Sequence, residues 1–241
     1  MIGESLEYTI DGRNYIGHIA YDDTRSGPRP GIILVHEWWG LNDFVREQAD
    51  KLAEQGYTAF AIDMYGDAAQ ADNPDDAKAM MLSVKDTPGE LEKRYRGALE
   101  VLKAHDSVDP ERIASQGYCF GGAVSLNMAR LGLDLKGVVS FHGNLGTDIQ
   151  IKPGDIKGQL QVYTGGADVM IPPQQVAAFV EEMQEAGVRF DLINYPGAQH
   201  GFTNPGATAK GQKFGFPVGY DANAARDAWE GSLAFYKRLF G

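Results

Sequence analysis

The stretch Gly117-Tyr118-Cys119-Phe120-Gly121-Gly122 stands where a predicted strand over residues 112–116 gives way to a predicted helix over residues 122–130. A turn this tight requires small residues two positions before and two positions after its central residue, and glycine occupies both places. The thiol of Cys119 then projects above the sheet at the N-terminus of a helix. The pattern is typical of a nucleophile elbow, whereas the competing interpretation of a free cysteine is a small buried core residue.

Short β-rich segments alternate with helical patterns on both sides of this stretch, which is typical of β-α-β units around a mostly parallel sheet. Strands are predicted over residues 7–10, 15–21, 31–35, 57–62, 112–116, 137–141, 159–163 and 190–195. Helices are predicted from an Asp43 cap to residue 55, over residues 77–84, from a Thr87 cap to about residue 105, and over residues 122–130, 173–185 and 223–239. We therefore expect an α/β fold with about eight strands, helices on both faces, and a single domain over residues 1–241.

The charge balance argues against a nucleic-acid partner. The chain carries 22 basic and 33 acidic side chains, a formal net charge of −11, and no run of Lys or Arg offsets it locally. The apolar runs are too short to span a bilayer, and the N-terminus lacks the pattern of an export signal, so we expect no membrane association. One cysteine cannot form an internal disulfide, which favours a reducing compartment and a cytoplasmic protein.

The base that activates an elbow thiol is expected after the nucleophile, because the chain order in such sites is nucleophile, acid, histidine. His142 follows Cys119 by only 23 positions, which leaves too little chain for a strand and loop that carry the acid. His200 lies in the loop Pro196-Gly197-Ala198-Gln199-His200-Gly201-Phe202, after the predicted strand over residues 190–195. We therefore predict that His200 is the base, although a loop histidine in isolation is usually a solvated surface residue.

The acid is expected at the end of the strand that lies between the nucleophile and the base. Asp168 follows the predicted strand over residues 159–163 and would orient His200 and support its positive charge. The other acids fit less well, because they precede that strand, lie within the next one or fall on a helix: Asp148, Asp155, Asp191, Glu181, Glu182 and Glu185. A loop or helix-capping role before Pro172 and Pro173 is the alternative for Asp168.

An oxyanion hole needs two backbone donors, one from the residue after the nucleophile and one from the loop after an early strand. Phe120 supplies the first amide, and Trp38 in His36-Glu37-Trp38-Trp39-Gly40 is the candidate for the second. A carboxylate such as Glu37 beside a thiol site favours the protonated thiol, although a solvated loop carboxylate is the alternative. No second histidine follows His36 at the spacing of a zinc signature, so we expect no metal and no cofactor.

These motifs together resemble those of the dienelactone hydrolase family of α/β-hydrolases over essentially the whole chain. The resemblance rests on Glu37, residues 117–122, Gly165-Gly166-Ala167-Asp168 and residues 197–202, in that order. Members of the family hydrolyse the enol-lactone formed in catechol and chlorocatechol ring cleavage, with a Cys-His-Asp triad and no cofactor. The resemblance implies Cys119 as nucleophile, His200 as base and Asp168 as its partner. It also implies that Glu37 holds the resting thiol and swings away when substrate arrives.

One departure from the family concerns the anionic end of the substrate. Enzymes that typify the family bind the dienelactone carboxylate with two arginines, but Asn204 stands where one would fall, and no arginine occurs between Arg46 and Arg94. Lys78 or Lys85 would be a weaker point charge that cannot reproduce a bidentate clamp. The predicted mouth is largely apolar, and its candidate substrate-binding residues are Trp39, Phe141, His142, Met170, Phe202 and Asn204.

The sequence thus predicts a cytoplasmic, cofactor-free hydrolase that opens a small lactone or ester through an acyl-enzyme on Cys119. A broad-range carboxylesterase acting on neutral short-chain esters is the alternative within enzymes. A redox-responsive or ligand-binding protein on the same scaffold is the alternative outside them, because exposed thiolates are oxidised. We expect the partner to be a small-molecule lactone or ester and the chain to be a monomer or a weak homodimer.

Overall fold

The structure is a computed structural model that describes residues 1–241, with eight strands and seven helices. The strands are β1 (Ile2–Ile10), β2 (Arg13–Tyr21), β3 (Arg29–Val35), β4 (Thr58–Ile62), β5 (Val108–Tyr118), β6 (Gly137–Phe141), β7 (Gln159–Gly165) and β8 (Phe190–Tyr195). The helices are α1 (Asp43–Glu54), α2 (Pro74–Lys85), α3 (Glu90–Lys103), α4 (Phe120–Arg130), α5 (Pro173–Glu185), α6 (Ala207–Phe214) and α7 (Ala222–Phe240). Its contacts divide the chain into two compact units, Met1–Ser115 and Gln116–Gly241.

The strands follow the order β1-β2-β4-β3-β5-β6-β7-β8 in the sheet. Pairing is antiparallel between β1 and β2 and between β2 and β4, and it is parallel between β3 and β4, between β6 and β7 and between β7 and β8. The predicted α/β fold with a mostly parallel sheet of eight strands is therefore confirmed. None of the helices combines the length and the apolar character needed to cross a membrane.

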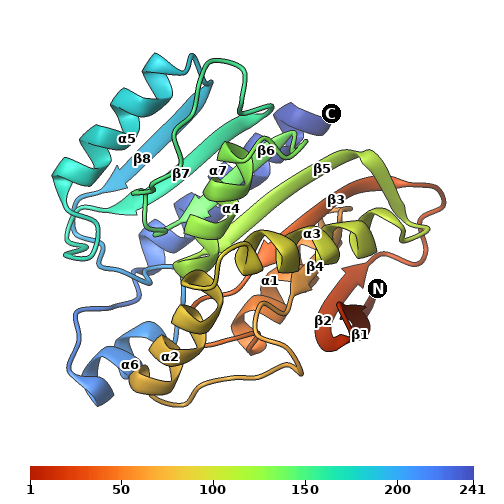
Figure 1. Cartoon of the computed structure of the whole chain (residues 1–241), viewed down its shortest axis with the longest axis horizontal. Helices are drawn as coiled ribbons and strands as arrows, with labels where there is room; N and C mark the ends of the chain where they lie inside the picture. Colours follow the sequence, from red (N-terminus) through yellow and green to blue (C-terminus); the bar gives the residue numbers. More distant parts are fainter. The chain divides into compact units, whose positions relative to one another are not determined.

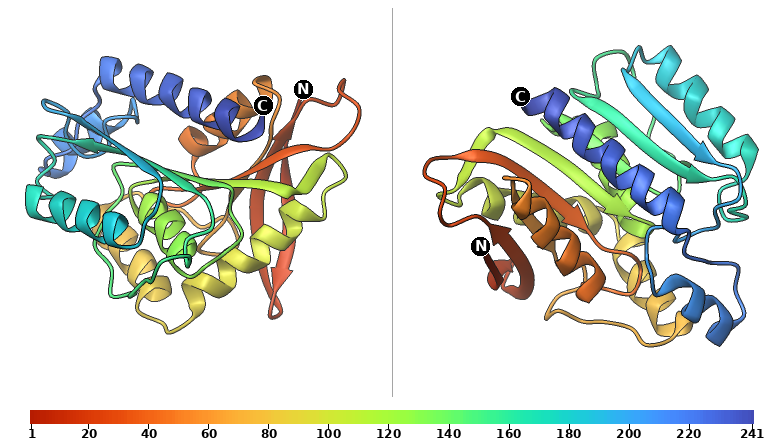
Figure 2. Two further views of the ribbon diagram at one scale, coloured as in Figure 1. Left: turned by 90° about the horizontal axis from the view of Figure 1, so that it is seen from above. Right: turned by 180° about the vertical axis from the view of Figure 1, so that it is seen from behind.

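Helices cover both faces of the strands within each unit. In the first unit, α1 contacts β2, β3 and β4, and α3 contacts β1, β3 and β4. Figure 1 shows α3 in front of these strands, and the view from behind in Figure 2 shows α1 in front. In the second unit, α4 contacts β6, and α7 contacts β6 and β7; α7 comes to the front when this unit is seen from behind (Figure 2).

The opening hairpin is longer than its apolar pattern predicts. Asp11 and Gly12 form its turn with φ of 49° and 77°, the left-handed values that a two-residue hairpin turn needs. Pairing with β2 begins at Ile2, five residues before the predicted start, because backbone hydrogen bonds extend the ladder along a mostly exposed strand. An exposed strand has no buried face, so its first residues carry no hydrophobic alternation.

Three helix starts differ from the predicted ones. Asn42, not Asp43, is the N-cap of α1. In α2 the Asn73 side chain accepts a hydrogen bond from the Asp76 amide at 3.0 Å, so the helix begins before residue 77. Thr87 does not cap α3; its hydroxyl donates to the Ser83 carbonyl, and Gly89 in the left-handed region precedes the helix.

The sequence analysis missed α6 altogether. The helix is only eight residues long, buries only Ala207 and Gly211, and has a glycine in its interior, so it shows no clear apolar face. Gly211 is required by the packing, since a Cβ atom there would lie 2.5 Å from the Val218 carbonyl oxygen. Tertiary contact, not local propensity, therefore maintains this helix.

A stack of four aromatic rings crosses the carboxyl ends of the strands in the second unit. Tyr118, Phe141, Tyr163 and Tyr195 lie nearly parallel, with successive ring centroids 4.9, 5.1 and 6.3 Å apart. Cys119 directly follows the first ring, and Asp168 and His200 come five residues after the third and the fourth. The stack therefore holds in register the strand ends from which the predicted catalytic residues leave.

Candidate active site

The backbone at Cys119 adopts the strained elbow between β5 and α4. Its φ of 54° and ψ of −113° lie outside the regions that non-glycine residues favour. The Cys119 amide donates to the Phe141 carbonyl at 3.0 Å, and the Cys119 carbonyl accepts from the Ala123 amide at 3.2 Å. One bond ties the elbow to β6 and the other opens α4, so the strain is maintained by the structure on both sides.

Two glycines allow this close approach. A Cβ atom on Gly117 would lie 2.0 Å from the Gly121 carbonyl oxygen, and one on Gly122 would lie 2.6 Å from Ser140 Oγ and 2.9 Å from Gly143 Cα. Contacts under about 3 Å do not occur for real Cβ atoms, so alanine at either site would push the helix away from the strand. Gly117, which the elbow pattern requires, thus has a direct steric cause, and Gly122 allows a second close approach, between α4 and the end of β6.

Asp168 and His200 form a buried pair in the loops after β7 and β8. His200 Nδ1 and Asp168 Oδ2 are 2.8 Å apart, and the Asp168 side chain has no exposed surface. The second oxygen, Oδ1, accepts from the Met170 amide at 2.8 Å, while the Asp168 amide donates to the Gly165 carbonyl at 3.2 Å. The carboxylate is therefore held from both sides, and it fixes one nitrogen of the imidazole.

His200 is poised to exist as a cation beside the thiol. Burial by itself would lower its pKa, but the charge of Cys119 and the hydrogen bond with Asp168 outweigh burial and raise the pKa to about 10. Since Asp168 occupies Nδ1, Nε2 is the nitrogen that remains for Cys119, and the interaction with Cys119 is among the causes that raise the pKa of His200. The structure therefore brings Cys119, His200 and Asp168 together.

Known proteins resemble this chain along nearly its whole length. A model of the dienelactone hydrolase family matches residues 17–240. The chain belongs to the dienelactone hydrolase family. A solved structure described as a dienelactone hydrolase-like promiscuous phosphotriesterase from metagenomic libraries is 31% identical, with a TM-score of 0.90, over 100% of this chain and 99% of the other.

Two relatives of known sequence match along nearly their full length. Protein usf from Aquifex pyrophilus is 29% identical over 98% of each chain. A protein from Aquifex aeolicus provisionally named carboxymethylenebutenolidase is 27% identical over 98% of each chain. Membership of the dienelactone hydrolase family indicates a hydrolase, and it agrees with the α/β-hydrolase fold.

His142 lies beside His200, and its imidazole is kept neutral. The residue is fully buried at the end of β6, and its ring centroid is 5.3 Å from that of His200. Burial, followed by the charge of His200, holds its pKa well below the ordinary value. His142 Nε2 and Thr203 Oγ1 are 2.7 Å apart. The sequence analysis did not single out Thr203, since a lone loop threonine carries no signal.

The remaining substrate-binding candidates of the second unit fall into two groups. Phe141 lies within the ring stack and Phe202 is fully buried against His142 and Tyr195, so neither offers an open surface. Phe120 is 7% exposed and Asn204 5% exposed, and the Asn204 side chain accepts from the Gly206 amide. Met170 is 41% exposed, and its neighbour Val169, which the sequence analysis missed, is 69% exposed. Val169 and Met170 therefore present exposed apolar surface in the loop that carries Asp168.

The first unit carries the loop that follows β3. Glu37 and Trp39 are buried there, and Trp38 is half-buried. His36 Nδ1 bonds the Glu37 carbonyl at 2.5 Å, and the Trp38 carbonyl accepts from the Tyr65 hydroxyl at 2.9 Å. The loop is thus well ordered, while the roles of Trp38 in the oxyanion hole and of Glu37 in thiol control stay predictions.

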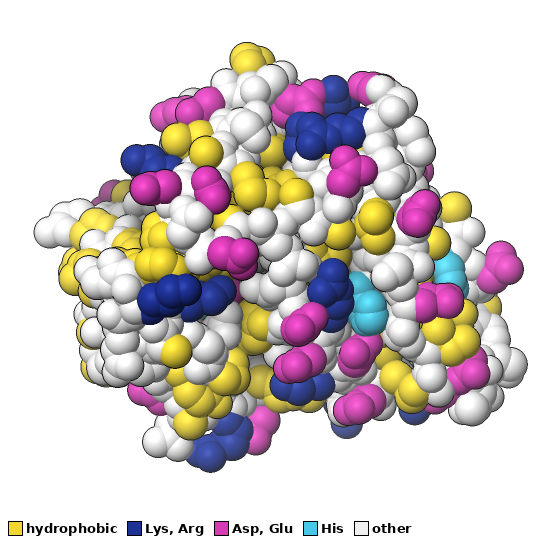
Figure 3. Space-filling view, turned by 90° about the horizontal axis from the view of Figure 1, so that it is seen from below, with side chains coloured by type: hydrophobic (Ala, Val, Ile, Leu, Met, Phe, Trp, Pro, Cys, Tyr) yellow, Lys and Arg dark blue, Asp and Glu magenta, His cyan; other side chains and the backbone are white.

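Lys78 and Lys85, the candidate substitutes for the missing arginines, are exposed on α2. Arg94, the nearest arginine beyond them in sequence, is buried and already engaged by Glu90 at 2.9 Å and by the Met64 carbonyl at 2.8 Å. Charged side chains on the face shown in Figure 3 are of both signs and interspersed. Lys78, Lys85 and Arg94 in the first unit therefore do not form a dedicated carboxylate clamp.

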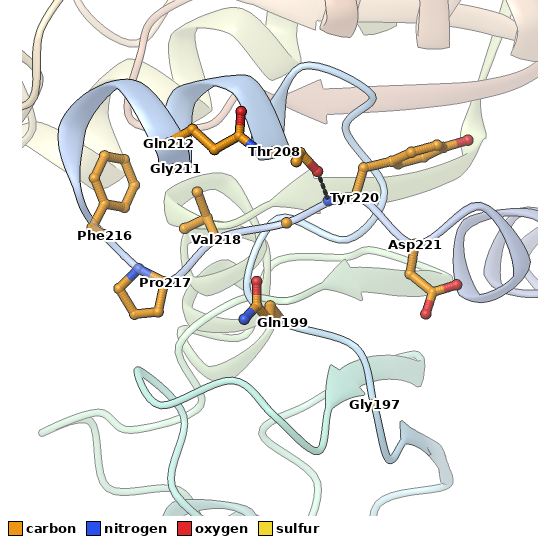
Figure 4. Close-up of a pocket in the computed structure, with 11 residues that line it drawn as sticks. Gly197, Gln199, Thr208, Gly211, Gln212, Phe216, Pro217, Val218, Tyr220 and Asp221 are labelled. Carbon is orange, nitrogen blue, oxygen red and sulfur yellow. Dashed lines mark hydrogen bonds between the residues drawn. The ribbon is translucent and has the colours of Figure 1, made fainter.

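A cavity of ≈ 420 Å³ lies beside the loop that carries His200 (Figure 4). Its lining comes from residues 197–221 and includes Gln199, Thr208, Gln212 and Phe216, but none of the triad residues. Gly219 allows this arrangement, because a Cβ atom there would lie 2.6 Å from Gln199 Oε1. The cavity therefore lies beside the loop after β8 and is not lined by Cys119, Asp168 or His200.

Proposed function

We propose that this chain hydrolyses small, uncharged lactones or esters through a Cys119 acyl-enzyme, with His200 as base and Asp168 as its partner. The observation that carries the proposal is the coupling of the three groups. Asp168 binds His200 Nδ1 at 2.8 Å, and the charge of Cys119 raises the pKa of the same imidazole. A thiolate beside an imidazolium is the reactive form of a cysteine nucleophile.

In acylation, the Cys119 sulfur attacks the carbonyl carbon of the substrate and forms a C–S bond. The tetrahedral oxyanion then collapses, the C–O bond to the alcohol breaks, and His200 delivers its Nε2 proton to the leaving oxygen. In a lactone this oxygen stays tethered to the acyl chain, so ring opening gives a hydroxyacyl thioester. The N-terminus of α4, where Cys119 is the N-cap, favours negative charge at this point.

In deacylation, neutral His200 takes a proton from water, whose oxygen attacks the thioester carbon. The C–S bond breaks, Cys119 leaves as thiolate, and the carboxylic acid product departs while His200 stays protonated. Asp168 supports the imidazolium in both half-reactions and keeps the correct tautomer. The amides of Phe120 and Trp38 are the proposed oxyanion donors, and Glu37 is the proposed partner of the resting thiol.

The proposed preference for uncharged substrates rests on the surroundings of the triad. Asn204, a neutral and buried residue, stands at the family's arginine position, and its side chain is engaged by the local backbone. Val169 and Met170 present apolar surface next to Asp168. Each charged hydrogen bond to a substrate carboxylate that is absent weakens binding by about 1.5–3 kcal/mol. A neutral ester loses nothing by this absence.

The test is a pre-steady-state measurement with a neutral aryl ester such as p-nitrophenyl acetate. We expect a burst of about one phenolate per Cys119, acetylation of Cys119 by mass spectrometry, and loss of both in Cys119→Ala and His200→Ala. Full esterase turnover in Cys119→Ala would overturn the proposal. Oxidation of the thiol without any His200-dependent acylation would favour the redox-responsive alternative, and a strong preference for an anionic dienelactone would contradict the assignment of uncharged substrates.

Neutral phosphotriesters are a second candidate substrate class. The observation in favour is the full-length similarity to a promiscuous phosphotriesterase together with the uncharged surroundings of the triad. In such a reaction the Cys119 sulfur attacks phosphorus and an aryl oxide leaves, after which water must cleave the P–S bond. Repeated turnover of an aryl dialkyl phosphate supports this candidate, whereas a single stoichiometric inactivation of Cys119 contradicts it.

A further inference from the structure

His142 lies against His200 and directly follows Phe141, whose carbonyl binds the Cys119 amide, yet the proposed mechanism does not use it. Its backbone continues the pairing of β6 with β7, since the His142 amide donates to the Tyr163 carbonyl at 2.8 Å. The residue before it, Phe141, accepts the Cys119 amide through its carbonyl. The φ of His142 is 41°, in the left-handed region that few non-glycine residues occupy. A residue other than glycine in such a conformation is strained, and this strain suggests that its side chain has a function.

The backbone after His142 lies directly against the first turn of the nucleophile helix. A Cβ atom on Gly143 would lie 2.7 Å from the carbonyl carbon of Gly122 and 2.8 Å from the amide nitrogen of Ala123. Since the Cys119 carbonyl accepts the Ala123 amide, this contact lies one hydrogen bond from the elbow. The backbone next to His142 is therefore packed against the turn that presents the thiol.

The His142 side chain points in the other direction, to the loop that carries the base. Its ring lies edge-on to His200 and Phe202, with centroids 5.3 and 5.2 Å away, and Nε2 is 2.7 Å from Thr203 Oγ1. The opposite side of this loop is held by backbone bonds, from the Gly219 amide to the His200 carbonyl and from the Asp221 amide to the Phe202 carbonyl, both at 3.1 Å. The bond between His142 Nε2 and Thr203 Oγ1 is a side-chain attachment of this loop to the residue that follows β6.

The protonation of His142 suits this contact. A charged ring would repel the His200 imidazolium, and burial together with that charge keeps His142 neutral. Nδ1 is buried without a partner. Because a bare acceptor nitrogen is tolerated more readily than a buried N–H, Nε2 carries the proton and donates to Thr203 Oγ1. Only a neutral imidazole meets both conditions, a donor for Thr203 and no charge beside His200.

We propose that His142 is a positioning residue, whose uncharged imidazole ties the base loop to the elbow through Thr203 and so sets the approach of His200 to Cys119. The inference rests on the proposed function in one respect, which is that the aligned pair of Cys119 and His200 carries out hydrolysis. The pair itself is measurable without a substrate, through the reactivity of Cys119 toward an alkylating agent.

The principal variant is Thr203→Val, which removes the hydroxyl and keeps the shape of the side chain. The matched control is Thr58→Val in the first unit, because Thr58 Oγ1 makes a bond of the same 2.7 Å length with Ser107 Oγ. Two further variants act on the ring: His142→Phe retains an aromatic ring without the donor, and His142→Asn tolerates the positive φ but is too short to reach Thr203. For each protein, kcat and KM on p-nitrophenyl acetate, the rate of Cys119 alkylation by iodoacetamide from pH 5 to 10, and Tm are measured.

We expect Thr203→Val to lower kcat about tenfold, with KM within about twofold of the wild-type value, because misalignment of reacting groups affects the chemical step. Alkylation at neutral pH falls by a similar factor, and His200→Ala abolishes the difference between Thr203→Val and wild type. Thr58→Val lowers Tm to a similar extent but leaves kcat and alkylation unchanged. His142→Asn and His142→Phe show the same kinetic loss as Thr203→Val.

A result in which Thr203→Val and the His142 variants lose only Tm, with kcat and alkylation unchanged, overturns the proposal and leaves His142 as a core residue. The outcome remains readable if the His142 variants do not fold, because Thr203→Val alters only the hydroxyl. Rapid, His200-dependent alkylation without ester turnover in the wild type would refute the proposed function, while the response of that alkylation to Thr203→Val would still decide the role of His142.

Discussion

Two histidines lie close together in the second unit, and their pKa values are shifted in opposite directions. His142 directly follows β6 and His200 lies in the loop after β8, with ring centroids 5.3 Å apart and with both side chains buried. Burial acts in the same direction on each, toward the neutral form. Yet the pKa of His142 falls well below its ordinary value, while that of His200 rises to about 10.

The difference arises from the partners and not from the depth of burial. His200 has a carboxylate on Nδ1 and the Cys119 sulfur near Nε2, whereas His142 has a neutral hydroxyl on Nε2 and nothing on Nδ1. Negative neighbours offset the cost of burying a charge, and a hydroxyl does not. The same residue type is thus charged in one region, where we propose it as the base, and neutral in the next, where we propose it as a positioning residue.

The largest effect on this contrast is expected from Asp168→Asn, which removes the negative partner and makes the two histidines more alike. We expect kcat to fall roughly 10³–10⁴-fold, because the amide neither supports the imidazolium nor selects its tautomer. Asp191→Asn is the control, since Asp191 is an exposed carboxylate paired with Arg238 at 3.1 Å. Ester turnover compared across the three proteins checks the prediction, and equal loss in both variants would contradict it.

Gly143→Ala changes the backbone next to His142, the neutral histidine of the pair. The new Cβ would lie 2.5 Å from Ser140 Oγ and 2.7 Å from the Gly122 carbonyl carbon, so β6 and α4 must separate. We expect the free energy of unfolding to fall by about 1–3 kcal/mol, as for other overpacked sites. Urea unfolding measures it, and Gly197→Ala, where the added Cβ meets nothing within 4 Å, serves as the unstrained control.

Cys119→Ala tests whether the thiol contributes to the high pKa of His200. Loss of the sulfur charge removes one of the groups that raise it, so the pKa of His200 should fall by about one unit or more while that of His142 stays low. Titration of the imidazole Cε1 proton signals by NMR, with Ser232→Ala as a buried reference substitution, reads both histidines at once. An unchanged His200 titration would show that Asp168 alone sets its charge.

The smallest effect concerns stability in acid. The folded protein keeps His142 neutral, but the unfolded chain binds a proton there as the pH falls below about 6.5, so His142 destabilises the fold progressively in that window. We expect His142→Phe to be less stable at pH 7 but to lose stability less steeply on acidification, by up to about 1.4 kcal/mol per pH unit. Thr203→Val keeps the titrating ring and should retain the wild-type slope in urea unfolding between pH 4 and 7.

Several structural features were predictable because they depend on local pattern. The apolar run that became β3 and the glycines around Cys119 report burial and close approach directly in the residue types. The N-terminal part of β1 and the short helix α6 were not predictable, since one is an exposed strand held by backbone pairing and the other a helix held by contact with Val218. The predicted cap of α3 was wrong because the Thr87 hydroxyl donates to the Ser83 carbonyl of the preceding helix α2 instead.

The family of the chain and the predicted order of nucleophile, acid and base could be read from the residues alone, because chain order and glycine spacing are properties of the covalent chain. The charge of each histidine and the burial of each aromatic side chain became visible only in the folded protein. Charge state depends on the atoms within a few ångströms of a buried ring, and those atoms come from residues up to 81 positions apart, as Cys119 and His200 are.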